Sequence, residues 1–214
     1  MMKKIRIVTI SIFAVLAAAY AIIQYGFYSP KLAGLVQYKL KSPNFHLTPW
    51  VYVLYMHIIT ACLALVIGPF QLFANKNGKR VRIHRLLGKV YVASIFISGM
   101  VNIYLSIFAS GRWVASFGFF FLDLFWLYST GMAVMWIIRG NVIQHKHWMW
   151  RSYSLTFAGV MLRIYLGPLL ALFHGDFIHA YQILAWIAWV PNLFLIEYCI
   201  QRARIKSTKA TTIH

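Results

Sequence analysis

Long apolar segments constrain this chain more than any other feature of its sequence. Six of them occur, at about residues 5–27, 50–74, 90–109, 114–138, 152–173 and 178–200. A helix of about 20 predominantly apolar residues spans the hydrocarbon core of a bilayer. Because a backbone in lipid must satisfy its own hydrogen bonds, each segment is expected to be a helix. The sequence therefore predicts an all-α, polytopic integral membrane protein, with six transmembrane helices in a bundle that contacts the lipid bilayer.

The basic residues predict how this bundle is oriented. The chain has 21 Lys and Arg residues against three acidic residues, a net charge of +18. Most of the cations fall in four segments that six spans would place on one side, residues 1–6, 75–89, 139–151 and 201–214. Cytoplasmic loops carry an excess of Lys and Arg. Both termini are therefore expected in the cytoplasm, in a bacterial-type plasma (inner) membrane, and no nucleic-acid partner is expected.

These segments divide the chain into four parts. Residues 1–27 are read as a first transmembrane helix, with a cleaved signal peptide as the alternative interpretation. Residues 28–49 are expected to form an extracytoplasmic loop, and residues 50–200 a five-helix membrane core. Residues 201–214 are expected to form a basic, frayed cytoplasmic tail.

Four polar residues from four successive apolar segments fall at similar depth. His57, Asn102, Asp123 and Arg163 each lie about 9–15 Å from the predicted outer end of their helix. A charge at bilayer depth costs about 2.5–3.5 kcal/mol on insertion scales, so Arg163 should be paired. One interpretation is a structural Asp123–Arg163 ion pair, with His57 and Asn102 completing its hydrogen bonds. The other is a site that binds a ligand or handles protons.

Small and polar residues at helical spacing indicate which helix faces point inward. On the fifth segment Ser152, Thr156, Gly159, Arg163 and Gly167 recur at intervals of three and four. Such faces pack against neighbouring transmembrane helices. We therefore expect one continuous inward face along this segment, with Arg163 on it.

A second polar cluster is predicted at the cytoplasmic ends of the third and fifth segments, and it comprises His84, Arg85, His145, His147 and Arg151. Neutral imidazole is a ligand of haem iron and of other transition metals. One interpretation is a b-type haem held by His84 and His147, with Arg85 or Arg151 on its propionates. The alternative is that these side chains meet lipid phosphates at the interface.

Three motifs resemble a known family. They are His57 with Gly68-Pro69-Phe70, the segment Ile83-His84-Arg85-Leu86-Leu87-Gly88-Lys89-Val90-Tyr91, and the segment His147-Trp148-Met149-Trp150-Arg151-Ser152-Tyr153 followed by Arg163. They are similar to the bacterial membrane protein family named domain of unknown function 2306, over roughly residues 50–170. The resemblance implies an integral membrane protein and no established activity.

A weaker similarity is to the dihaem transmembrane cytochromes b, whose haems are held by histidines on paired helices. The fourth segment here has no histidine and offers Asp123 instead, which leaves no partner of that kind for His57. This similarity therefore implies at most the one haem between His84 and His147.

Three functions remain open at this point. The first is a redox-linked protein with a b-type haem at His84 and His147. The second is a transporter or a proton- or ligand-binding protein built on His57, Asn102, Asp123 and Arg163. The third is a membrane scaffold or assembly factor without a cofactor. Redox or assembly partners would lie in the membrane. No soluble-enzyme motif occurs, and the sequence does not decide whether the protein is an enzyme.

Overall fold

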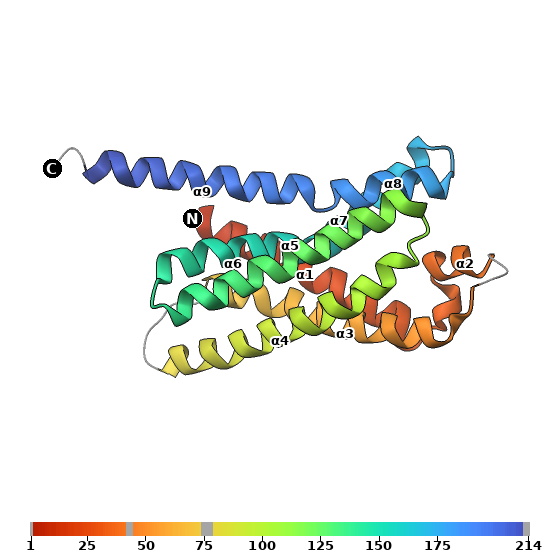
Figure 1. Cartoon of the computed structure of the whole chain (residues 1–214), viewed down its shortest axis with the longest axis horizontal. Helices are drawn as coiled ribbons and strands as arrows, with labels where there is room; N and C mark the ends of the chain where they lie inside the picture. Colours follow the sequence, from red (N-terminus) through yellow and green to blue (C-terminus); the bar gives the residue numbers. More distant parts are fainter. Residues whose placement is uncertain (1, 42–44, 74–78, 212–214) are drawn as a thin grey trace.

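The computed structural model describes residues 2–41, 45–73 and 79–211, and within these ranges the chain is helical apart from short turns (Figure 1). Six of the described helical segments are long and apolar enough to cross a membrane, namely Ile7–Phe27, Leu47–Leu72, Val81–Ile107, Arg112–Ile138, Val142–Leu172 and Phe177–Ile205. This confirms the all-α, six-span architecture. Helix α1 begins and α9 ends toward the same end of the bundle, as an even number of spans requires. Which side of the membrane that end faces stays a prediction.

The helices follow one another with short connections. The first half of the chain contains α1 (Met2–Ile22), a π-helical turn (Ile23–Phe27), a 3₁₀ turn (Pro30–Leu32), α2 (Gly34–Leu40), α3 (Leu47–Phe73) and α4 (Lys79–Ile107). The second half contains α5 (Arg112–Ile138), α6 (Val142–Thr156), α7 (Ala158–Leu172), α8 (Phe177–Ile187) and α9 (Val190–Thr211). The fifth span is thus made of α6 and α7, and the sixth of α8 and α9.

The helices extend well beyond the apolar segments into the basic ones. Helix α4 begins at Lys79 and α6 at Val142, while α9 ends at Thr211. The expected basic loops and the expected frayed tail are therefore largely helical, although residues 74–78 and 212–214 lie outside the described residues. Lys and Arg are good helix formers whose long side chains reach the aqueous interface. Hydropathy consequently marks where the lipid ends and not where the helix ends.

The outer segment between the first two spans contains a helix rather than only a loop. Helix α2 carries Lys39, whose Nζ donates a hydrogen bond to the backbone carbonyl of Phe108 at the outer end of α4. The same ammonium lies 5.0 Å from the ring centroid of Trp50. Burial lowers the pKa of Lys39 to about 8, because the protein replaces the water around its charge. These contacts hold α2 against the outer ends of α3 and α4.

The fifth span changes direction at Phe157. Its backbone angles there are φ −69° and ψ −12°, whereas a regular helix has ψ near −42°. Ser152 and Thr156, before the break, are buried, but Arg163 and Gly167, after it, are exposed. The expected inward face is therefore confirmed only in part: Thr156, Gly159 and Arg163 all line the internal cavity described below, but the face is exposed from Arg163 onward.

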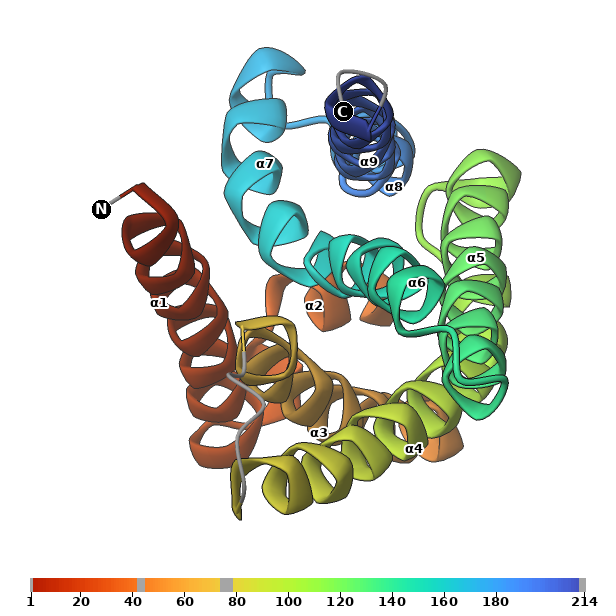
Figure 2. The same cartoon turned by 90° about the vertical axis from the view of Figure 1, so that its left-hand side faces the viewer.

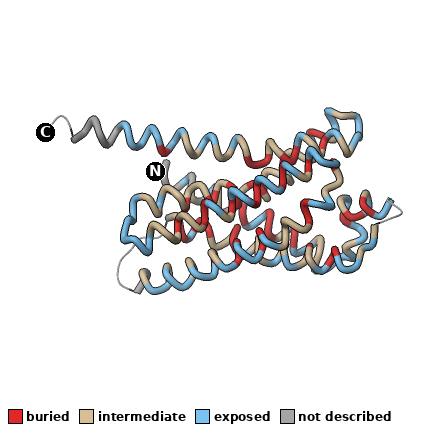
Figure 3. Tube along the Cα trace, in the orientation of Figure 1, coloured by how far each residue is buried: buried red, intermediate tan, exposed pale blue. Residues whose placement is uncertain are grey.

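The bundle buries aromatic and small residues at its centre and exposes apolar residues around its outside. Tyr91, Ile95 and Trp126 lie in the largest buried cluster, where α4, α5 and α6 meet. Helix α3 packs mainly along α4, and α5 along α6 and α4. Large apolar side chains such as Trp113 and Phe194 are instead 77% and 72% exposed. Exposed positions follow the outer sides of the helices along most of the bundle (Figure 3). Such a surface suits lipid, so the protein is membrane-embedded.

The contact between Gly68 and Tyr153 generates a prediction about stability. A Cβ atom at Gly68 in α3 would lie 2.1 Å from a ring carbon of Tyr153 in α6. The Tyr153 hydroxyl also donates to the Leu65 carbonyl at 3.3 Å, which leaves the ring little freedom to move. We expect Gly68→Ala to cost about 1–3 kcal/mol by overpacking, measured as a lower thermal unfolding midpoint in detergent.

Gly167 supplies the matched control, because it also precedes a proline within a helix and a Cβ there meets nothing within 4 Å. Gly167→Ala should unfold at the same temperature as the unmodified protein. Equal unfolding midpoints for the two variants would contradict the close helix contact at Gly68.

Candidate functional site

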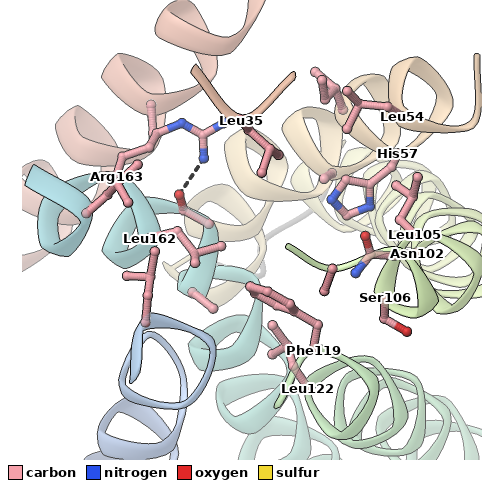
Figure 4. A pocket seen from close by; sticks show the side chains of 18 of the residues that line it. Leu35, Leu54, His57, Asn102, Leu105, Ser106, Phe119, Leu122, Leu162 and Arg163 are labelled. Atoms are coloured by element: carbon pink, nitrogen blue, oxygen red, sulfur yellow. Dashed lines mark hydrogen bonds between the residues drawn. The ribbon is translucent and has the colours of Figure 1, made fainter. Parts of the chain in front are cut away.

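A cavity of about 490 Å³ lies inside the bundle, in the part covered by α2. All four residues of the predicted polar layer line it: His57 from α3, Asn102 from α4, Asp123 from α5 and Arg163 from α7. Figure 4 shows Arg163 on one side of the cavity and His57 and Asn102 on the opposite side. The fold thus brings together residues that are spread over more than 100 positions of the sequence.

Asp123 is held by Asn102. The Asn102 Nδ2 donates to both carboxylate oxygens of Asp123, at 2.9 and 2.8 Å. Asp123 is only 1% exposed. The ion pairs among the described residues join Arg151 to Glu197 and His179 to Asp176, and neither includes Asp123. The expected Asp123–Arg163 ion pair is therefore wrong.

Arg163 has other partners. Its Nη1 donates to the carbonyl of Gly159, one turn earlier in α7. Its guanidinium carbon lies 5.7 Å from the ring centroid of Tyr20 in α1, which is a cation–π distance. These contacts lie on α7 itself and on α1, on the side of the cavity opposite His57 and Asn102.

His57 faces the serine row of α4. Its Nδ1 lies 2.9 Å from the hydroxyl of Ser98, which is fully buried. This face of α4 points inward, since Tyr91, Ser94, Ser98 and Ser106 are all buried. The histidine is therefore fixed against α4 at the wall of the cavity, on the same side as Asn102.

A buried hydroxyl network extends from the cavity wall into the bundle. The Tyr91 hydroxyl lies 3.0 Å from Ser152 Oγ and 3.2 Å from Thr156 Oγ1. Thr156 also accepts a hydrogen bond from Trp126 Nε1 at 2.9 Å, and Ser152 lies 2.8 Å from the Thr130 hydroxyl. Thr156 and Trp126 both line the cavity. Sequence reasoning missed Thr130 and Trp126, although a threonine in the middle of an apolar segment was a usable signal.

The predicted cytoplasmic cluster divides into two groups. Arg151 forms an ion pair with Glu197 of α9, with Nη2 2.6 Å from Oε2, and its guanidinium carbon lies 4.6 Å from the Trp148 ring. His145 Nδ1 donates to the Ala133 carbonyl at 2.8 Å. These contacts join α6 to α5 and α9. Arg151 thus has a carboxylate partner within the protein itself.

His84 and Arg85 belong to the other group, on α4. The carbonyl of His84 accepts a hydrogen bond from Gln71 Nε2 at 3.2 Å, and Arg85 is exposed. Seen from this end of the bundle, the first turns of α4 and α6 lie apart (Figure 2). The sequence predicted both groups at the same membrane face, but it did not predict the lateral distance between them.

The contacts of His147 do not suit haem ligation. Arg204 Nη2 lies 3.3 Å from His147 Nδ1. A guanidinium can only donate, so Nδ1 accepts and the proton of the neutral ring lies on Nε2. A protonated Nε2 has no lone pair for iron, so ligation of a haem through this nitrogen would require the contact with Arg204 to break. We derive no chemistry from a haem at His84 and His147.

The fold and the cavity define a multi-pass α-helical membrane protein with an internal cavity, whose mostly apolar wall carries a few polar residues. Residues 54–200 match the family described as Predicted membrane protein (DUF2306), and the chain belongs to this family. The match confirms the expected resemblance and extends it into α9. No curated protein and no solved structure matches the chain.

The hydroxyl network generates a prediction. Tyr91→Phe removes the hydroxyl that joins Ser152 and Thr156, and interhelical hydrogen bonds in membranes contribute about 0.6–1.7 kcal/mol. We expect the thermal unfolding midpoint to fall. Tyr52→Phe, at a position that is 67% exposed, is the control and should leave the midpoint unchanged. If Tyr91→Phe were as stable as the unmodified protein, the network would not contribute to stability.

Proposed function

We propose that this protein binds a small ligand in the intramembrane cavity and that Asp123 holds a proton there. It would then be a proton-linked ligand-binding or transport protein of the bacterial plasma membrane. The observation that supports this most directly is the environment of Asp123. Its carboxyl group lines the cavity, is buried, and has hydrogen bonds from the Asn102 amide alone among the described residues.

Charge burial supports a proton at this position. An ionised carboxylate away from water is costly unless a cation or several donors compensate it. A carboxylate has about four lone-pair sites, and one amide group serves only part of them. A bound proton removes the charge, and a ligand donor could occupy the remaining sites. The sequence suggested Arg163 as the cation that would compensate Asp123, but Arg163 contacts Gly159 and Tyr20 instead.

The size and lining of the cavity support a ligand. Its volume of about 490 Å³ lies within the 300–1,000 Å³ typical of small-molecule sites. Such sites have mostly apolar walls with a few placed polar groups. Here apolar residues such as Leu54, Phe119 and Leu162 line the cavity, with Arg163 on one side and Asn102 on the opposite side.

Infrared spectroscopy tests the proton on Asp123. At pH 7 we expect the C=O stretching band of a protonated carboxyl group in the unmodified protein and its loss in Asp123→Asn. The variant should insert and unfold almost as the unmodified protein does, because asparagine keeps the shape and can accept from Asn102. A missing band in the unmodified protein, or failure of Asp123→Asn to insert, would instead favour a structural role for the pair.

Asp176→Asn is the control for this experiment. Asp176 is exposed in the turn before α8, and a hydrogen bond from His179 lowers the pKa of Asp176 below its usual range. Asp176 is therefore ionised at pH 7 and contributes no protonated band. Asparagine also keeps the N-terminal cap that Asp176 provides for α8. The band should be the same with and without this substitution.

A b-type haem at His84 and His147 stays a separate prediction, which the contacts of His147 do not favour. An absorbance spectrum of protein produced with added haem precursor decides it, together with a dithionite difference spectrum. A Soret band that is lost in both His84→Ala and His147→Ala would establish the haem, and its absence would exclude it. A scaffold without a ligand is the remaining alternative. It predicts stable partners that co-purify and no protonated band that depends on Asp123.

A further inference from the structure

We infer that the ligand of this cavity is a single-chain amphipathic anion that enters from the lipid between α1 and α7 and places its anionic group on Arg163. The inference rests on the ligand-binding cavity of the proposed function and adds the chemical class of the ligand and its route. Three features support it: the unmet hydrogen-bonding capacity of Arg163, the position of the opening, and the apolar lining of the interior.

Arg163 is a cation deep in the membrane with few partners. Nine residues separate it from Leu172, the end of α7, so it lies about 13 Å from that end. A guanidinium has five N–H donors, and the contacts found among the described residues are the Gly159 carbonyl and the Tyr20 ring. A cation at this depth costs about 2.5–3.5 kcal/mol on insertion scales, so an anion that pairs with it there is stabilised.

The cavity reaches the outside of the bundle beside Arg163. Helices α1 and α7 meet through Ala14 and Val160, which share a buried cluster. Further along each helix, Tyr20 and Arg163 both line the cavity and are both exposed, Tyr20 by 56%. Both positions lie within transmembrane spans, so this opening faces lipid rather than water. A ligand that uses it must partition into the membrane.

The lining of the cavity favours a ligand whose remaining part, behind the charged group, is apolar. Between Arg163 and the opposite wall the cavity is lined by apolar side chains, among them Leu162, Phe119 and Leu122. Asp123 presents little charge to this space, because it is 1% exposed and bound to Asn102. The volume of about 490 Å³ suits one drug-sized molecule, which favours a single chain over a two-chain phospholipid.

Equilibrium binding of radiolabelled oleate tests the inference. The full chain is reconstituted in phosphatidylcholine nanodiscs, and oleate is compared with oleyl alcohol, which has the same chain and no charge. We expect saturable binding of one oleate per chain and much weaker binding of the alcohol. Arg163→Gln should raise the Kd of oleate at least about 10-fold, because a charge-assisted hydrogen bond is lost. Equal binding of the alcohol would overturn the inference.

Arg202→Gln is the matched control. Arg202 is also an exposed arginine, and its guanidinium carbon lies 5.7 Å from the Tyr198 ring, the same distance as between Arg163 and Tyr20. It does not line the cavity. Oleate affinity should be unchanged in Arg202→Gln, and an equal loss in both variants would show that the anion binds basic surfaces in general and would overturn the site.

Phosphatidylglycerol distinguishes the two sources of an anionic group on an acyl chain. A single-chain ligand predicts that phosphatidylglycerol added to the nanodiscs leaves oleate binding nearly unchanged. Full competition would overturn the single-chain class in favour of an anionic phospholipid.

A photoreactive diazirine fatty acid provides a second measurement that needs no variant, which matters if Arg163→Gln fails to fold. Cross-links to the unmodified protein should fall in α7 near Arg163 and in α1 near Tyr20. Cross-links confined to outward residues such as Phe117 would overturn the route.

Asp123→Asn separates this inference from the proposed function. If Asp123 holds a proton, Asp123→Asn removes no negative charge from the cavity wall, so it should not tighten oleate binding. Tighter binding in Asp123→Asn would mean that Asp123 is ionised, which contradicts the proposed proton and leaves the anion site at Arg163 intact. The opposite outcome is an infrared band that is lost in Asp123→Asn, together with oleate affinity that is unchanged by Arg163→Gln. It would support the proton on Asp123 and overturn the anion site at Arg163.

Discussion

Lipid offers no hydrogen-bond partners, so every polar group inside this bundle must find one in the protein or in a ligand. The backbone meets this requirement by forming helices over all six spans. The side chains meet it with contacts between helices. Tyr91, Ser152 and Thr156 satisfy one another where α4 and α6 meet, and Asn102 satisfies Asp123 where α4 and α5 meet. The arrangement of the central helices therefore follows from pairing their polar groups as much as from packing their apolar ones.

Among the polar groups that the structure describes inside the bundle, Arg163 is the one whose hydrogen-bonding capacity is least satisfied. The arginine follows the irregular turn at Phe157, is exposed, and forms no ion pair with the enclosed Asp123. It lies at the edge of the cavity instead, against a tyrosine ring and a carbonyl of its own helix. Asp123, at the opposite wall, is enclosed. The two charged residues that the sequence suggested as partners thus have different surroundings, and this difference underlies the cationic opening and the neutral interior that we propose for the cavity.

The end of the bundle that is predicted to be cytoplasmic has a different character from the cavity. Arg151 there pairs with Glu197, a group that the helices themselves provide. His145 and His147 have neighbours on α5 and α9. At this end Glu197, the single acidic residue of the sixth span, forms an ion pair with Arg151 of the fifth span. This pair connects α6 to the long α9. Membership of the DUF2306 family fits a membrane protein of this kind and leaves its ligand to be defined by experiment.

The sequence by itself determined the membrane class, the six spans and the four polar residues that line the cavity. Each of these depends on local properties, because apolar length and charge at depth can be read along a single helix. Only the tertiary structure decided which polar groups are partners. Asp123 pairs with Asn102 rather than Arg163, and α4 and α6 begin apart across one face of the bundle. Rotation of helices about their axes and their lateral separation depend on packing between segments, which the pattern of a single segment does not contain.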